Sequence, residues 1–357
     1  MNKNSLQKLM KICLDKHLNF VVFSLPNSTQ FEIIIENQLL CNHVGSHFIF
    51  HPFQVSETNA VVKISSDYRI SDSLIDDDFI ETIKAIPSTE LTAKKLEFTP
   101  ETKVNYVKNL NSEISKLANS NLNKFIYSRL KTVENTSNLD LSKYLITLNK
   151  KHNSAFVYLL HHQISGTWLG ATPETLISWK GNKITTMALA GTQPNNGNSP
   201  TWTNKEKEEQ EYVTQYIEKA FSQSQIEYEK GAVHHVNAGP VFHLKTEISS
   251  QKNITYNQAK SLSNLLHPTP AVCGVPLDLA IQKIKEVETY NRAYYTGYLG
   301  LITPDKELNL FVNLRCMQVF KNQLALYLGG GITASSNAEK EWDETNFKAE
   351  TLLSDLN

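Results

Sequence analysis

The sequence predicts an α+β fold with antiparallel sheets. Strand-like runs follow one another in groups, and they do not alternate with helices as regular βαβ units would. The pair Gly181-Asn182 stands between two such runs, which favours a hairpin turn. The 357 residues are enough to bury a sizeable core in one large domain, with two ordinary domains as the alternative.

The N-terminal part begins with a helical pattern over residues 5–17. Short β-like runs follow at residues 19–25, 31–37 and 47–53. An acidic patch at 76–78 and a polar stretch at 87–102 then interrupt the pattern. We therefore place a soft boundary after residue 103 and expect residues 1–103 to be integral to the same domain as residues 104–357.

From about residue 104 the helical and strand-like patterns become sharper. Helical patterns cover residues 104–117, 204–222, 256–266 and 277–290. Strand-like runs cover residues 124–133, 154–162 and 176–191. Three more runs, at 297–303, 308–320 and 323–330, are separated by short polar turns and predict an antiparallel meander before a final helix.

The charges nearly balance, with 35 Lys and Arg against 36 Asp and Glu. This balance gives no electrostatic reason to expect nucleic acid or an anionic membrane as a partner, and it favours a small-molecule substrate. The four cysteines lie far apart without a CxxC pair, which indicates free thiols in a reducing cytoplasm. No apolar stretch is long enough to cross a bilayer, so we expect a soluble, cytoplasmic protein.

The C-terminal segment combines a glycine run with charged residues at helical spacing. Gly329, Gly330 and Gly331 precede a predicted helix, in which Glu341, Glu344 and Lys348 share one face. Glycine lets the backbone approach a ligand closely, and carboxylates with an ammonium suit a divalent metal beside an anion. A solvated helix with a Glu344–Lys348 ion pair is the alternative.

A second carboxylate pair, Glu206 and Glu209, repeats the spacing of Glu341 and Glu344. Carboxylate oxygens from two distant helices are suited to Mg2+, with positions left for water and a substrate carboxylate. Thr203 and Glu206 also fit a capping box, in which Glu206 serves only the start of its helix. The spacing alone leaves both interpretations open.

Taken together, these segments resemble the chorismate-utilising enzymes, which include isochorismate synthase, salicylate synthase, anthranilate synthase component I and aminodeoxychorismate synthase component I. The resemblance runs from about Val104 to the C-terminus and is loose before it. It rests on nine ordered matches: KFIYSR, GATPETL, LAGT, KEKEEQEYV, FHLKT, HPTPAVCGVP, ETYNRAYYTGYLG, LR, and GGGIT leading to EWDETNFK. The resemblance implies a single large α+β domain, with antiparallel sheets packed between helices and the site in a cleft above them.

The resemblance also implies roles for individual positions. Glu209 and Glu344 match direct Mg2+ ligands, with Glu206 and Glu341 as neighbouring carboxylates. The positions that match the substrate pocket are Thr192, His243, Ala271, Tyr295, Arg315, Lys348 and the backbone of Gly329, Gly330 and Gly331. Arginine offers a planar fork and lysine a point charge to a substrate carboxylate.

Two further positions match the acid and base of the family. Lys124 matches the general base that activates water, and Glu174 matches the general acid that protonates the departing C4 hydroxyl of chorismate. Such roles require a deprotonated lysine and a protonated glutamate, and burial shifts both pKa values in those directions. Taken singly, these two residues and His243 also fit a strand-end lysine, a turn carboxylate and a core histidine.

Within the family, the sequence favours isochorismate synthase, which adds water at C2 without eliminating pyruvate. Ala271 resembles isochorismate synthases, where lyase members tend to carry threonine, and Ala190 replaces the nucleophilic lysine of aminodeoxychorismate synthases. Tyr295 does not discriminate, and Gln210 stands where the family usually has histidine. Salicylate synthase, an anthranilate synthase-like lyase and a non-catalytic chorismate-binding regulator are the alternatives. We expect Mg2+ as cofactor, chorismate as substrate, no amidotransferase subunit, a monomer or weak dimer, and a role in menaquinone rather than siderophore biosynthesis.

Overall fold

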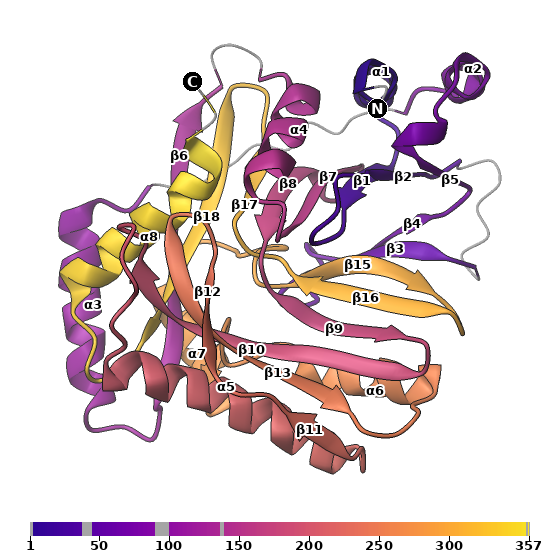
Figure 1. Cartoon of the computed structure of the whole chain (residues 1–357). Coiled ribbons are helices and arrows are strands. Elements are labelled where there is room, and N and C mark those ends of the chain that lie inside the picture. Colours follow the sequence, from indigo (N-terminus) through magenta and orange to yellow (C-terminus); the bar gives the residue numbers. More distant parts are fainter. Residues whose placement is uncertain (1–2, 38–44, 90–99, 136–138, 355, 357) are drawn as a thin grey trace.

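Two antiparallel sheets lie between layers of helices in the computed structural model (Figure 1). The structure describes residues 3–37, 45–89, 100–135, 139–354 and 356. Within these residues each sheet has nine strands, and every strand pair is antiparallel. The prediction of an α+β fold with antiparallel sheets is therefore confirmed.

The first sheet contains the two long strands nearest the C-terminal helix. Its strand order is β14-β6-β18-β17-β8-β7-β1-β2-β5. The strands are β1 (Phe20–Ser24), β2 (Glu32–Ile35), β5 (Tyr68–Ser71), β6 (Lys124–Glu134), β7 (Phe156–His162), β8 (Gly166–Thr172), β14 (Gly274–Val275), β17 (Cys316–Val319) and β18 (Gln323–Ile332).

The second sheet has the order β11-β13-β10-β9-β16-β15-β3-β4, with β12 also paired to β13. Its strands are β3 (His47–His51), β4 (Val62–Ser65), β9 (Thr175–Lys180), β10 (Lys183–Pro194), β11 (Tyr228–Lys230), β12 (His234–Asn237), β13 (Val241–Ser250), β15 (Tyr298–Thr303) and β16 (Glu307–Val312). The first 103 residues thus supply strands to both sheets, since β1 pairs with β7 and β3 with β15.

The helices cover the outer faces of the sheets (Figure 1). Helices α5 and α6 pack on the second sheet, whereas α3 and α7 pack beside β6. The described helices are α1 (Lys3–Asp15), the 3-10 turn Asp72–Leu74, α2 (Asp77–Ala85), α3 (Lys103–Leu117), α4 (Leu141–Lys151), α5 (Asn204–Gln223), α6 (Tyr256–Leu266), α7 (Leu277–Val287) and α8 (Ala338–Leu353).

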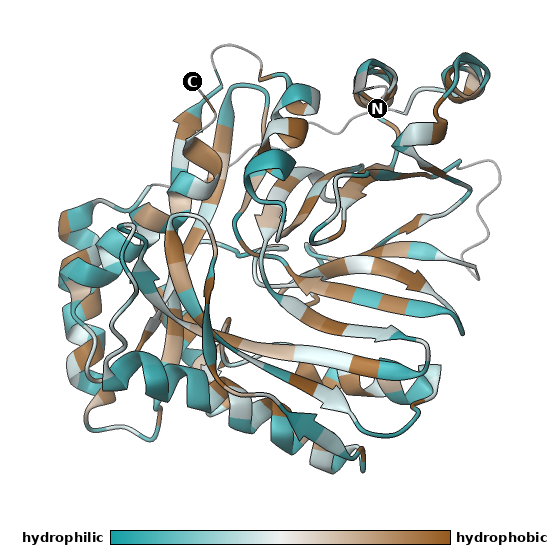
Figure 2. Ribbon diagram, in the orientation of Figure 1, coloured by the Kyte–Doolittle hydropathy of each residue, from teal (hydrophilic) through white to brown (hydrophobic). Residues whose placement is uncertain are grey.

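Strand β1 illustrates how the sheet is buried on both faces. Successive side chains of a strand point to opposite faces. Phe20 and Val22 pack in the cluster beneath α1 and α4, whereas Val21 and Phe23 pack toward the second sheet. The unbroken apolar run is therefore typical of a strand covered on both sides. Figure 2 shows hydrophobic colour on many strand segments and hydrophilic colour along much of α5.

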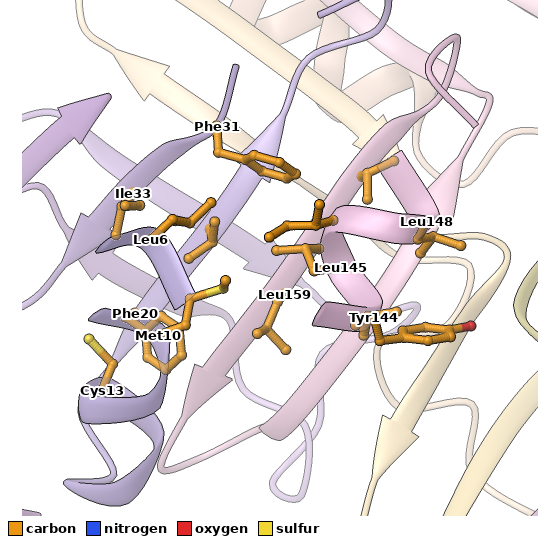
Figure 3. Close-up of a cluster of buried hydrophobic side chains, with 14 of the residues drawn as sticks. Leu6, Met10, Cys13, Phe20, Phe31, Ile33, Tyr144, Leu145, Leu148 and Leu159 are labelled. Atoms are coloured by element: carbon orange, nitrogen blue, oxygen red, sulfur yellow. The ribbon is translucent and has the colours of Figure 1, made fainter. Parts of the chain in front are cut away.

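The outer cluster of the first sheet joins the N-terminal helix to the rest of the domain (Figure 3). Leu6 and Met10 of α1 lie over Phe20, and Leu145 of α4 completes the same cluster with Leu159 of β7. These side chains are nearly or fully buried. The N-terminal residues therefore share a core with the later part of the chain.

The hairpin at Gly181-Asn182 is confirmed, because these two residues join β9 to β10 and both have positive φ, 57° and 63°.

The prediction of a single strand at 308–320 is wrong. This run forms two strands in different sheets, β16 and β17, separated at residues 313–315, so the predicted meander is also wrong. Arg315 lies in this crossing with φ of 46°. The following elements were not predicted from the sequence: β4, β5, β8, β11, β12, β13, β14, α2, α4 and the 3-10 turn Asp72–Leu74.

Cys13, Cys273 and Cys316 are buried free thiols, as expected, and Cys41 lies outside the described residues. Among the residues placed by the structure, no helix combines the length and apolarity needed to cross a bilayer.

Candidate active site

A cavity at the junction of the two sheets collects most of the predicted site residues. Its walls come from the start of β6, the turn before β9, the ends of β10 and β18, and helices α5 and α8. All predicted site residues line it except Glu206 and Glu341, which line a neighbouring cavity with Glu344. Segments more than 200 residues apart in the chain therefore meet in one place, as the ordered motifs imply.

Lys124 and Glu174 enter this cavity from β6 and from the turn before β9. Their exposed fractions are 1% and 3%. Burial lowers the pKa of Lys124, although the carboxylate of Glu209 opposes the shift. Burial raises the pKa of Glu174 to about 8, against the opposing ammonium of Lys124. The two pKa values thus move in the directions that favour a neutral amine and a neutral carboxylic acid.

Arg315 and His243 form a polar pair on another wall. The Nδ1 of His243 lies 2.9 Å from the carbonyl oxygen of Gly191, so this nitrogen carries the proton. Its Nε2 is then free to accept a hydrogen bond from Nη2 of Arg315 at 3.0 Å. Burial and the adjacent Arg315 lower the pKa of His243 to about 3, so the ring is neutral. Arg315 also donates to Thr351 and is held as a fixed cation facing the cavity.

The glycine run of β18 lets charged side chains lie against the backbone. A Cβ on Gly331 would come within 2.9 Å of Glu209 Oε2 and within 2.8 Å of Lys124 Cε. A Cβ on Gly330 would lie 3.0 Å from Glu341 Oε2. An added Cβ at either position would therefore push these charged side-chain ends away from the backbone. The run therefore makes room for the carboxylates of α5 and α8.

The sequence matches the family described as "Chorismate binding enzyme" over residues 26–357. The chain belongs to this family of chorismate-binding enzymes. The match also covers most of the N-terminal part, where the motifs alone give only a loose resemblance.

Relatives and solved structures agree with this assignment. The chain is 29% identical over 252 residues to isochorismate synthase EntC of Escherichia coli, an alignment that covers 66% of this chain and 63% of the relative. The structure of MenF, the menaquinone-specific isochorismate synthase from Escherichia coli, superposes on this chain with a TM-score of 0.74 and 20% sequence identity. The match covers 94% of this chain and 88% of the MenF chain. Anthranilate synthase component I from Streptococcus pneumoniae has a TM-score of 0.68 with 16% identity, covering 94% of this chain and 92% of its own. The shared fold therefore includes members named for different reactions.

In this chorismate-binding enzyme two of the predicted metal-binding carboxylates, those of Glu209 and Glu341, contact the ammonium group of Lys205. Lys205 Nζ lies 2.7 Å from Glu341 Oε1 and 3.3 Å from Glu209 Oε1. Lys348 Nζ lies 2.6 Å from Glu344 Oε1 and 2.8 Å from the carbonyl oxygen of Gly329. The expected Glu344–Lys348 ion pair is present, but on the cavity wall and not on a solvated surface.

The donor set fits a hard divalent cation in its chemistry. Three carboxylates converge on Gly330 and Gly331, and the buried Glu341 Oε2 accepts no hydrogen bond. Among the described residues, no group of three or more Asp, Glu, His or Cys side chains is arranged so that it could hold a metal ion as it stands. The ammonium of Lys205 lies between two of the predicted ligands, so a cation bound to both would take its place.

Glu206 is used by the start of α5, as in the capping-box alternative. Its Oε2 accepts hydrogen bonds from the backbone N–H and the hydroxyl of Thr203, at 2.8 Å and 2.5 Å. The other face of this helix start lies against Gly191, whose added Cβ would meet Glu206 Cβ at 3.0 Å. A role of Glu206 in metal binding stays a prediction.

Gln210 has a clear task at the position where the family usually has histidine. Its Oε1 accepts from the backbone N–H of Ala190, and its Nε2 donates to the carbonyl of Ala188 and to Thr246 Oγ1. These contacts attach α5 to β10 at the register shift between Ala190 and Thr192. Gln210 thereby fixes the helix that carries Glu209.

A buried ion pair holds the turn that carries Ala271. Arg292 forms two hydrogen bonds with Glu288, at 2.6 and 2.8 Å, and donates to the carbonyls of Val272 and Ile126. It therefore ties the proline-rich turn to β6, beside Lys124. The sequence predicts that this turn is rigid, and Arg292 lies within the motif ETYNRAYYTGYLG, but the sequence does not show its role in holding the turn.

Arg129 holds α8 on β6 in a similar way. It donates to Thr345 Oγ1 at 2.8 Å and to Asn346 Oδ1 at 2.7 Å, and its guanidinium lies 3.8 Å from the ring centroid of Trp342. Helix α8 carries Glu341, Glu344 and Lys348. Arg129 is thus a positioning residue that sequence reasoning missed.

We expect Arg129→Met to lower the free energy of unfolding by about 1–3 kcal/mol, because two hydrogen bonds to a buried charge are lost. Urea denaturation measures this change. Arg69→Met is the matched control, since Arg69 forms partly exposed ion pairs with Glu32 and Glu307, and we expect less than about 1 kcal/mol there. Equal effects of the two variants would contradict the role given to Arg129.

Proposed function

We propose that this chain is an Mg2+-dependent isochorismate synthase, which converts chorismate to isochorismate by adding water at C2 and releasing the C4 hydroxyl. The observation that carries the proposal is the buried pair of Lys124 and Glu174 in one cavity, with pKa values shifted in opposite directions. The relative EntC, which is named an isochorismate synthase, supports the same reaction.

Substrate binding is assigned to the cationic groups on the cavity wall. Arg315, oriented by His243 and Thr351, would receive one carboxylate of chorismate, and Lys348 would contribute a second positive charge. Glu209 and Glu344, with Glu341, would hold Mg2+, which supplies a positive charge that fixes the substrate carboxylate. Tyr295 and Thr192 complete the walls.

The acid and base act on opposite ends of the rearranging diene. Neutral Lys124 takes a proton from water as the C2–O bond forms, and protonated Glu174 gives its proton to the C4 oxygen as the C4–O bond breaks. One water enters and one leaves, so the reaction is an isomerisation. Lys124 Nζ lies 3.8 Å from Glu209 Oε2, and this carboxylate opposes the fall in the lysine pKa that burial causes.

Ala271 favours hydration over the lyase alternatives. Its side chain lines the cavity and ends at Cβ, so it brings no hydroxyl into the site. Salicylate synthase, which would eliminate pyruvate after hydration, is the second candidate in the family. Because water is the proposed nucleophile, no amidotransferase subunit is part of the proposal.

Incubation of the purified protein with chorismate and Mg2+, followed by chromatography, tests the proposal. We expect isochorismate as the main product, loss of activity with EDTA and recovery with added Mg2+. Salicylate, or anthranilate in the presence of ammonium, as the main product would overturn it. Binding of chorismate without turnover would instead support a regulator.

The pKa shifts predict the pH dependence of kcat/KM. Glu174 must hold its proton, and its pKa of about 8 means that kcat/KM should fall about tenfold per pH unit above pH 8. Lys124 must be neutral, so activity should also fall toward acid pH, with a limit lower than the ordinary lysine pKa. Initial rates across pH 5 to 10 measure this profile. A kcat/KM that still rises through pH 9 would contradict the assignment of Glu174.

We also propose menaquinone biosynthesis as the destination of the product, as for the menaquinone-specific enzyme of Escherichia coli. Deletion of the gene should then abolish menaquinone and leave siderophore production intact.

A further inference from the structure

The side chain of Lys205 has an unusual position for a lysine near the start of a helix. Residue 205 is the second residue of α5, where the helix dipole favours anions and disfavours cations. Its side chain is 19% exposed, so most of the stem is buried. A solvated helix face therefore does not explain this residue.

The ammonium of Lys205 links the two helices that carry the predicted metal ligands. It contacts Glu209 one turn further along α5 and Glu341 on α8, a residue 136 positions away. These carboxylates come together around Gly330 and Gly331, where like charges would otherwise repel one another. In the structure, Lys205 provides a positive charge at the place where the two helices meet.

The structure also provides space for this ammonium to leave. Lys205 lines the neighbouring cavity of about 750 Å3, together with Thr203, Glu208 and Asp343. Glu208 and Asp343 are exposed carboxylates on this side, where Lys340 also lines the cavity and Lys103 Nζ lies 3.8 Å from Asp343. Four rotatable bonds let the lysine side chain reach this cavity without movement of α5.

We propose that Lys205 is the resident cation of the metal-free site, whose ammonium holds Glu209 and Glu341 together and is displaced into the neighbouring cavity when Mg2+ binds. This inference rests on the Mg2+ part of the proposed function. It assigns Lys205 a positioning role in the metal-free protein and makes it a competitor of the metal.

Two binding measurements without chorismate test the competition. Lys205→Met keeps the length of the stem and removes the charge, and Lys207→Met is the control because Lys207 is exposed on the same helix. By titration calorimetry, we expect Lys205→Met to bind Mg2+ at least tenfold more tightly than the wild type, and Lys207→Met to bind it equally. In EDTA, the Lys205→Met protein should unfold at a lower temperature, and Mg2+ should restore its stability.

Amine labelling distinguishes displacement from simple repulsion. The rate at which an amine-reactive reagent modifies Lys205, followed by mass spectrometry, should rise at least threefold when Mg2+ is added, whereas the rate at Lys207 should not change. An unchanged or slower rate at Lys205 would overturn the proposal, as would unchanged or weaker Mg2+ binding by Lys205→Met. If this variant folds only with Mg2+, the proposal is supported; if Mg2+ does not rescue a folding defect, it is contradicted.

Failure of the proposed function would look different. If neither the wild type nor Lys205→Met binds Mg2+, both the metal and this inference are wrong, while isochorismate formation is still measured separately. If the wild type binds Mg2+ and forms isochorismate but labelling of Lys205 does not respond, only the inference about Lys205 is wrong.

Discussion

Lys124→Met should lower kcat by about 100- to 10,000-fold, the usual contribution of a general base. Methionine keeps the length and much of the packing of the buried lysine, but it has no amine to accept a proton from water. The KM for chorismate should change much less, because the predicted carboxylate contacts come from Arg315 and Lys348. Steady-state kinetics at saturating Mg2+ measures both quantities.

Lys131→Met is the matched control, since Lys131 lies on the same strand outside the cavity lining. Its kcat should remain within about twofold of the wild type, as for other surface substitutions away from a site. A loss of less than tenfold in Lys124→Met, with the protein folded, would argue against Lys124 as the base. Circular dichroism of both variants separates lost chemistry from lost fold.

Glu174→Gln should have an effect of similar size, about 100- to 10,000-fold on kcat, because an amide cannot protonate the C4 oxygen in the way a carboxylic acid does. Glutamine preserves the shape of the side chain. The backbone of Glu174 is held by Thr172 Oγ1 and by the N–H of Val312, so its position should be maintained.

Residual activity of Glu174→Gln gives a second readout. Its kcat/KM should lose the decline above pH 8 that Glu174 causes in the wild type. Glu211→Gln, an exposed change on α5, should keep both the wild-type rate and the wild-type profile. If Glu174→Gln still shows the alkaline decline, another group causes it and the acid role of Glu174 is wrong.

The fold could be predicted where a strand or helix has its own local signal. Gly181-Asn182 marks a turn through residues that tolerate positive φ, and the helical patterns at 204–222, 256–266 and 277–290 correspond to α5, α6 and α7. The run at 308–320 misleads because apolar residues recur along its whole length, whereas the chain crosses between sheets at residues 313–315. That crossing depends on distant partners, since Asn313 accepts a hydrogen bond from Tyr158 and donates to the carbonyl of Tyr294.

The site could be predicted for residues that belong to recognisable motifs. The spacing of Glu341 and Glu344, repeated by Glu206 and Glu209, places each pair on one helical face, and the motif order brings the helices together. The spacing does not show that Glu206 caps its helix and leaves Glu209 to face Lys124 at 3.8 Å.

The residues that hold the site in place also lie inside the matched motifs, but the motifs do not show what these residues do. In the sequence alone, little distinguishes these residues from surface cations, because most of their partners lie on other elements. They are Lys205, Arg129 and Arg292. Burial of such a charge is informative only once the fold supplies the carboxylates and hydroxyls around it. For Lys205, its place in the first turn of a helix, where the dipole disfavours a cation, is a further local hint that was overlooked.

Product analysis after turnover in H2(18)O tests the central claim most directly. If Lys124 activates water toward C2 while Glu174 releases the C4 hydroxyl, mass spectrometry should find isochorismate with a single 18O, located in the C2 hydroxyl, and no pyruvate. Isochorismate without label, or salicylate together with pyruvate as the main products, would contradict it.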